Sequence, residues 1–135
     1  MKNTFCTALG IIGGYIARLF GGWNAALGAL IMCMAIDYAT GLIVAGVFHT
    51  SPKSPGGGLE SQVGWKGLAR KVVTLLIVVT AHEMDVLLDI QYIRDAVVIG
   101  FCANEVISIL ENAGLMGLPI PGVLREAIDQ LKRKE

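Results

Sequence analysis

The sequence predicts an all-α integral membrane protein with three to four transmembrane helices arranged as hairpins, followed by a C-terminal amphipathic helix. Of the 135 residues, 54% are apolar and only 16% are charged, and the mean hydropathy is +0.64. A soluble domain of this length rarely has so few charges to cover its surface. The apolar residues also fall in long blocks, and one block, Ala25–Phe48, contains a single charge. We treat the whole chain as one membrane domain.

The first helix is expected at about residues 4–20, which is slightly short for a membrane span. Arg18 interrupts it near its end. Two arrangements therefore stay open: the helix crosses the membrane, giving four crossings, or it lies on the outer surface as an amphipathic helix, giving three. Gly10 and Gly14 form a GxxxG step, a spacing that favours close packing between membrane helices.

The second helix is expected over residues 25–48, with Asp37 near its middle. Such a helix reaches about 36 Å, enough to cross the bilayer core. A carboxylate at mid-membrane costs about 2.5–3.5 kcal/mol on insertion-based scales, so Asp37 should face protein or water. We expect a functional or assembly role for it. Four small residues in this helix repeat at a spacing that suits helix packing: Ala25, Ala29, Gly41 and Ala45.

Residues 49–64 are rich in Pro, Gly and Ser and are expected to form a flexible cytoplasmic linker. A third helix is expected at about residues 68–90 and a fourth at about 93–117. Polar residues follow one stripe of the fourth helix and are bordered by Glu105: Asn104, Ser108, Glu111 and Asn112. In a membrane such a stripe either lines a pore or holds helices together, and both interpretations stay open.

The orientation of the chain is predicted from lysine and arginine near the ends of the spans. Near the connector between the third and fourth helices, Arg94 is the single lysine or arginine in the sequence. Most of the other basic residues lie in the linker region and in the tail, and six of them are expected to be cytoplasmic anchors: Lys66, Arg70, Lys71, Lys132, Arg133 and Lys134. The tail, residues 121–135, has apolar residues at helical spacing, so we expect an amphipathic cytoplasmic helix whose basic end contacts anionic headgroups.

Neither an enzyme nor a cofactor site is expected. The net charge is zero, which argues against a nucleic-acid partner. The three cysteines are far apart and form no CxxC pair, so neither a metal site nor a disulfide framework is predicted. His82 and Glu83 begin like a zinc-protease helix, but position 86 is Val where the second histidine ligand would be needed.

Five sequence motifs, in this order along the chain, resemble those of a known family: Phe20–Trp23, Ile36–Gly41, Gly64–Lys71, Ala103–Ala113 and Gly117–Pro121. With these segments the chain resembles the toxin-secretion/phage-lysis holins, a bacteriophage holin family, over nearly its whole length. The linker is longer and richer in glycine than expected for that family. The third helix is also more polar around residues 82–85.

The resemblance implies a small protein of the bacterial cytoplasmic membrane that forms a homo-oligomer. It then opens a lesion through which a cell-wall-degrading endolysin, or in some relatives a toxin, leaves the cell without being specifically bound. A chain this short can hardly enclose a pathway alone, so conduction needs several copies. Two other functions stay open: a small ion- or proton-coupled transporter that uses Asp37 and Glu105, and a membrane scaffold whose polar stripes only specify helix pairing.

Overall fold

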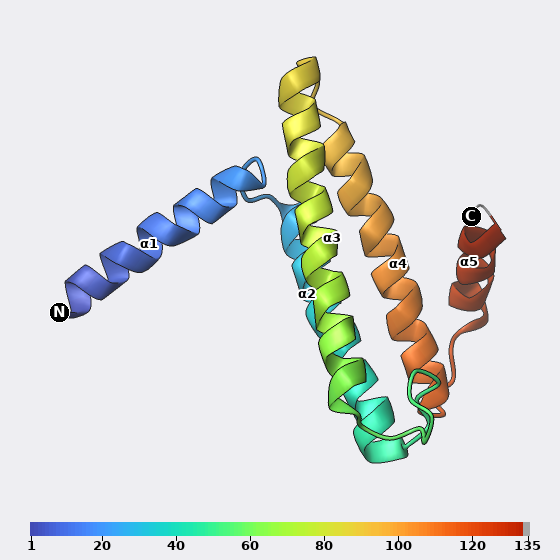
Figure 1. Ribbon diagram of the computed structural model, residues 1–135. Coiled ribbons are helices and arrows are strands. Elements are labelled where there is room, and N and C mark those ends of the chain that lie inside the picture. The colour runs from blue at the N-terminus through green and yellow to red at the C-terminus, as the bar shows by residue number, and fades with distance from the viewer. Residues whose placement is uncertain (134–135) are drawn as a thin grey trace.

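The computed structural model describes residues 1–133, which form five α-helices and one π-helical turn, without a strand. The all-α prediction is confirmed. In chain order the elements are α1 (Lys2–Leu19), α2 (Ala25–Ile43), η1 (Val44–Phe48), α3 (Ser61–Leu88), α4 (Ile93–Leu115) and α5 (Gly122–Arg133). Helices α2, α3 and α4 run antiparallel to their chain neighbours in a three-helix bundle, and α4 packs against both others (Figure 1).

An apolar core holds one half of this bundle together. Leu27, Leu30 and Met34 of α2 are buried against Val78 of α3 and Val98 of α4. The α2 positions recur at three- and four-residue intervals, which places them on one face of the helix. Toward the linker, the buried positions between the helices become polar, and the bundle holds charged side chains there.

The connector between α3 and α4 is fixed by Asp85. Its two carboxylate oxygens accept hydrogen bonds from the backbone N–H groups of Ile93 (2.9 Å) and Arg94 (3.0 Å). These donors lie in the first turn of α4, where no carbonyl of the helix can reach them, so Asp85 acts as a cap from the preceding helix. The buried guanidinium of Arg94 in turn donates to the carbonyl of Gly22 at 3.0 Å and ties the α1–α2 turn to the bundle.

The segment between η1 and α3 is shorter and more folded than the predicted flexible linker. Helix α3 begins at Ser61, well before the expected start at residue 68. Tyr38 supports this early turn, because its hydroxyl donates to the carbonyl of Gly64 at 3.2 Å. Within the linker, Ser54 Oγ donates to the Gly58 carbonyl at 2.7 Å, so the glycine-rich stretch forms a hydrogen-bonded turn.

Helix α1 projects away from the bundle and contains no buried residue (Figure 1). Among the residues that the structure describes, Ala25–Phe48 is the one helical segment long and apolar enough to cross a membrane by length and composition alone. The expected total of three to four transmembrane helices therefore stays a prediction.

Candidate functional site

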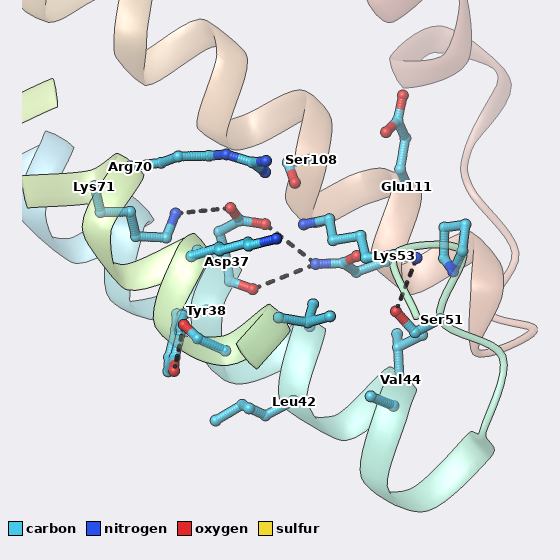
Figure 2. A pocket seen from close by; sticks show the side chains of 18 of the residues that line it. Asp37, Tyr38, Leu42, Val44, Ser51, Lys53, Arg70, Lys71, Ser108 and Glu111 are labelled. Carbon is cyan, nitrogen blue, oxygen red and sulfur yellow. Dashed lines mark hydrogen bonds and ion pairs between the residues drawn. The ribbon is translucent and has the colours of Figure 1, made fainter. Parts of the chain in front are cut away.

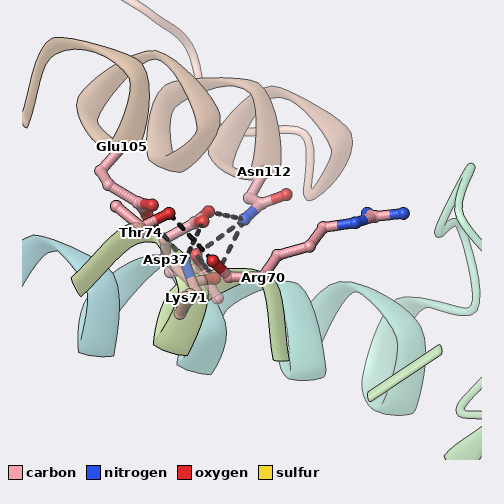
Figure 3. A network of polar contacts seen from close by, with 7 residues as sticks. Asp37, Arg70, Lys71, Thr74, Glu105 and Asn112 are labelled. Carbon is pink, nitrogen blue, oxygen red and sulfur yellow. Dashed lines mark hydrogen bonds and ion pairs between the residues drawn. The ribbon is translucent and has the colours of Figure 1, made fainter. Parts of the chain in front are cut away.

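Three charged side chains from three helices meet inside the bundle. Lys71 Nζ of α3 lies 2.9 Å from Asp37 Oδ2 of α2 and 2.8 Å from Glu105 Oε2 of α4 (Figure 3). The three side chains expose only 9% to 16% of their surface. One ammonium group is thus shared by two carboxylates, so this charged cluster links all three helices of the bundle.

Asn112 of α4 extends the cluster with its side-chain amide. Its Nδ2 lies 3.1 Å from Asp37 Oδ1, 3.3 Å from the Asp37 carbonyl and 2.9 Å from Thr40 Oγ1. Both carboxylate oxygens of Asp37 therefore have partners, one in Lys71 and one in Asn112. A buried ionised group needs such compensation, because its lost hydration is otherwise a large free-energy cost.

The helical repeat explains why these side chains meet. Asp37 follows the buried Met34 by three residues, and Lys71 precedes the buried Val78 by seven. Residues three, four or seven apart share one helix face, and Glu105 has the same relation to the core of α4. The inward face of each helix is therefore apolar at the level of Leu30 and charged at the level of Lys71.

A cavity of about 570 Å³ lies beside the charged cluster, at the linker end of the bundle (Figure 2). Asp37, Lys71 and Glu105 form part of its wall. Further polar side chains that line it are Tyr38, Lys53, Lys66, Arg70, Asn104 and Ser108. In Figure 2, Arg70 reaches from α3 toward Ser108. The charged cluster is thus reached from one end of the bundle.

The predicted polar residues do not all lie in the cluster. Asp37, Glu105 and Asn112 belong to it, whereas Ser108 and Asn104 lie beside it in the wall of the cavity. Glu111 is exposed at the cavity rim. The stripe expected along α4 therefore lines one cavity, with Asn112 buried in its hydrogen-bonded part and Asn104 and Glu111 exposed.

The predicted packing residues also divide into two groups. Ala45 is buried, and a Cβ added at Gly41 would lie 3.9 Å from Asn112 Nδ2, an ordinary van der Waals contact, so Gly41 faces α4 but has room for a small side chain. Ala25 and Ala29 are exposed. A Cβ added at Gly10 or Gly14 would meet no atom within 4 Å, because no other helix of residues 1–133 packs against this part of α1.

Lys71 differs from the other basic residues that were expected to be cytoplasmic anchors. Lys66, Arg70 and Arg133 are exposed, whereas Lys71 points inward and binds the two carboxylates. Its assignment as a headgroup anchor is corrected accordingly. The side chain of Lys132 and the whole of Lys134 lie outside what the structure describes. Spacing could have identified Lys71, because it is in helical phase with Leu75 and Val78.

Comparison with known proteins gives consistent matches over most of the chain. The model of the bacteriophage holin family matches residues 14–133. An uncharacterized protein of Halalkalibacterium halodurans is 39% identical and the match covers 93% of this chain and 91% of that protein. A 14.9 kDa protein of Clostridium perfringens is 33% identical, covering 92% and 89%. A probable holin of Bacillus phage phi105 is 31% identical, covering 76% and 70%. No solved structure matches the chain.

Proposed function

The chain belongs to the bacteriophage holin family, and from this membership we propose that it oligomerises in the bacterial cytoplasmic membrane and forms lesions. These lesions release a cell-wall-degrading endolysin, or a toxin, and contribute to lysis of the host cell. The observation that carries the proposal is the Asp37–Lys71–Glu105 cluster, which hides three charges between helices with apolar outer faces.

The packing of α2 against α3 and α4 supports insertion of the whole bundle. The segment Ala25–Phe48 has 24 residues and suits a membrane span. Helices α3 and α4 pack on it, so they share its depth, and their 28 and 23 residues correspond to about 42 Å and 35 Å. The face of α3 that points away from the bundle exposes a set of aliphatic side chains: Val72, Val73, Leu76 and Ile77. Lipid covers such a surface at lower cost than water does.

The charges in α3 and α4 are compatible with this arrangement. Judged by composition alone, Lys71 and Glu105 argue against a membrane location for α3 and α4, because each ionised group at mid-membrane has a free-energy cost. Since Lys71 is bound by two carboxylates inside the bundle, none of the three charges faces lipid. Among residues 1–133 only Ala25–Phe48 is apolar enough to span a membrane by composition alone, yet α3 and α4 also expose aliphatic side chains, such as Leu76 and Ile99.

The positive-inside rule orients the bundle. The linker and the C-terminal end of α4 lie at the same end of the bundle (Figure 1). The basic residues Lys53, Lys66 and Arg70 are near this end, and the basic tail follows it. We therefore assign this end and the C-terminus to the cytoplasm. Arg94, at the other end, is buried and held by Gly22, so it is not a free anchoring charge.

The charged cluster holds the three helices of the single chain together before any lesion forms. Lys71 holds α2 through Asp37 and α4 through Glu105, so separating these helices breaks at least one ion pair. When copies accumulate and their helices exchange partners, the released charges require water. When several copies form a ring with these side chains turned inward, the charges are hydrated by water in the centre of the ring. The ring then lines a lesion in the membrane.

Inducing the chain in a bacterium while following membrane potential and viability tests this function. A lesion-forming protein gives an abrupt loss of potential after a delay. The Asp129→Asn variant, which removes an exposed carboxylate of α5, serves as a matched control and should keep wild-type timing. Induction with no loss of potential contradicts the proposal and favours a scaffold.

One observation favours the transporter as a second candidate function. The cavity gives Asp37 and Glu105 a route to one end of the bundle, as a titrating carboxylate in a carrier requires. A transporter gives a graded flux that depends on the ion supplied and saturates with it. The same induction experiment therefore separates the two functions by the time course of depolarisation.

A further inference from the structure

Three cationic side chains line the cavity beside the charged cluster without a charged partner among residues 1–133: Lys53, Lys66 and Arg70. Lys66 and Arg70 are four residues apart on α3, so they project from the same face. Lys53 belongs to the linker, on another side of the cavity (Figure 2). Two separate segments of the chain thus bring positive charge to one opening.

The acidic groups of the cavity do not neutralise these three cations. Asp37 and Glu105 are bound by Lys71 deep in the wall. The carboxylate of Glu111 points away from Lys53 and Arg70 (Figure 2). Glu60, at the start of α3, is the other acidic residue in the wall. The lining as a whole is neutral, because four cations stand against four carboxylates. At the opening, three cations stand against Glu60 and Glu111, so positive charge is in excess there, while the deep end holds the charged cluster.

The surroundings of the opening match the boundary between headgroups and acyl chains. Trp65 is 71% exposed next to Lys66, and indole rings are enriched at that boundary. Beyond Arg70 the outer face of α3 continues with the exposed Val72 and Val73. Apolar side chains also line the cavity: Leu42, Val44, Leu59, Val63 and Leu115. A ligand with a phosphate group and an aliphatic part meets complementary surfaces here.

We propose that this cavity binds the phosphate headgroup of an anionic phospholipid from the cytoplasmic leaflet. Arg70 supplies a planar pair of donors to the phosphate oxygens, and Lys53 and Lys66 supply further positive charge. A volume of about 570 Å³ is in the range of small-molecule sites. The bound lipid holds the linker against α3 beside the charged cluster. The inference rests on the proposed membrane insertion and orientation, but not on lesion formation.

The test measures which lipids stay bound to the full-length protein. The chain is reconstituted in nanodiscs containing equal amounts of phosphatidylglycerol and phosphatidylcholine, and retained lipids are counted by native mass spectrometry. We expect phosphatidylglycerol to be enriched. In the triple variant Lys53→Gln, Lys66→Gln, Arg70→Gln the enrichment should fall by about fivefold for each cation removed, since each is worth about 1 kcal/mol near an anionic surface.

A matched control removes three positive charges that do not line the cavity: Lys2→Gln, Arg18→Gln and Arg125→Gln. This control should keep the wild-type enrichment. If the control loses as much as the cavity variant, diffuse surface charge explains the selectivity and the site is refuted. Unchanged enrichment in the cavity variant refutes it as well. The single variant Lys53→Gln, which alters only the linker, guards against misfolding of α3 and should lose about fivefold.

Free phosphate is the alternative source of the same chemistry. Inorganic phosphate is therefore titrated against the protein loaded with phosphatidylglycerol. Displacement by phosphate at a concentration equal to that of the lipid refutes the lipid assignment in favour of a free anion. A chain that enriches phosphatidylglycerol but causes no depolarisation in cells supports this inference and contradicts lesion formation, so the two failures are distinguishable.

Discussion

Lys71 of α3 binds Asp37 of α2 with an Nζ–Oδ2 distance of 2.9 Å, although 34 positions separate them in the chain. The two side chains lie on inward helix faces, and the carboxylate of Glu105 on α4 forms a second ion pair with the same Lys71 ammonium group. A buried ion pair of this kind contributes little net stability compared with apolar residues of the same shape. Removing only one of the two partners is costly, because the charge that remains is still buried away from water and no longer has an opposite charge beside it.

Replacing Lys71 with Met should destabilise the closed bundle by about 3–5 kcal/mol, because Asp37 and Glu105 then face each other without a cation. Resistance of the nanodisc-embedded protein to denaturant measures the effect. Lys2→Met removes a lysine from the exposed α1 and should change stability by less than about 0.5 kcal/mol. Equal stability of the two variants would mean that the cluster does not hold the helices together.

Asp37→Asn should change the onset of membrane failure without preventing insertion. The amide keeps the size of the side chain but removes the charge that binds Lys71, so the contact between α2 and α3 weakens. Time-resolved membrane potential after induction measures the onset, and membrane fractionation measures insertion. Wild-type timing in this variant would reduce Asp37 to a packing role.

Asn112→Ala should destabilise the bundle by about 1–3 kcal/mol. The variant removes the amide that binds Asp37 and Thr40, and it leaves buried acceptors unsatisfied. Asn104→Ala is a matched control on the same helix, since Asn104 is exposed and should change stability by less than about 0.5 kcal/mol. Denaturant midpoints that coincide for the two variants would contradict the hydrogen bonding of Asn112.

Gly21→Ala should destabilise the α1–α2 turn more than Gly22→Ala. Both glycines have left-handed backbone conformations, with φ of 84° and 94°, so each substitution carries the same type of backbone strain. Only at position 21 does the added Cβ collide with the imidazole of His82. Protease sensitivity of the turn measures the difference, and His82→Ala should relieve it in the double variant. Failure of that rescue would remove His82 from the explanation.

Replacing Gly10 and Gly14 with Leu should weaken oligomers without unfolding the chain. Neither glycine contacts another helix within the chain, so the larger side chains disturb no intramolecular packing. Chemical crosslinking in membranes measures the oligomers, and circular dichroism checks the helix content. An unchanged crosslinking ladder would exclude this face of α1 from contacts between copies.

The site was only partly predictable from the sequence. Asp37 was identified by its isolation in an apolar segment, and Asn112 and Glu105 by their position on α4. Lys71 was assigned to the cytoplasmic anchors because it adjoins Arg70 and follows Lys66 in a basic run. Chain proximity suggested a shared role for these residues. Helical phase separates them, because Lys71 is turned toward the buried carboxylates while Lys66 and Arg70 are exposed at the opening of the cavity.

The sequence by itself determined the helical class, the breaks between helices and the family, because these depend on local periodicity, glycine and proline positions and ordered motifs. Helix α3 begins at Ser61 and not at the predicted residue 68, and within its first turn the Gly64 carbonyl accepts a hydrogen bond from Tyr38 of another helix. Only the tertiary structure decided which carboxylates share Lys71, that Asp85 caps α4 and that the cavity gathers Lys53 with Arg70. These features join residues far apart in the chain, and they depend on how the helices are rotated and offset when they pack.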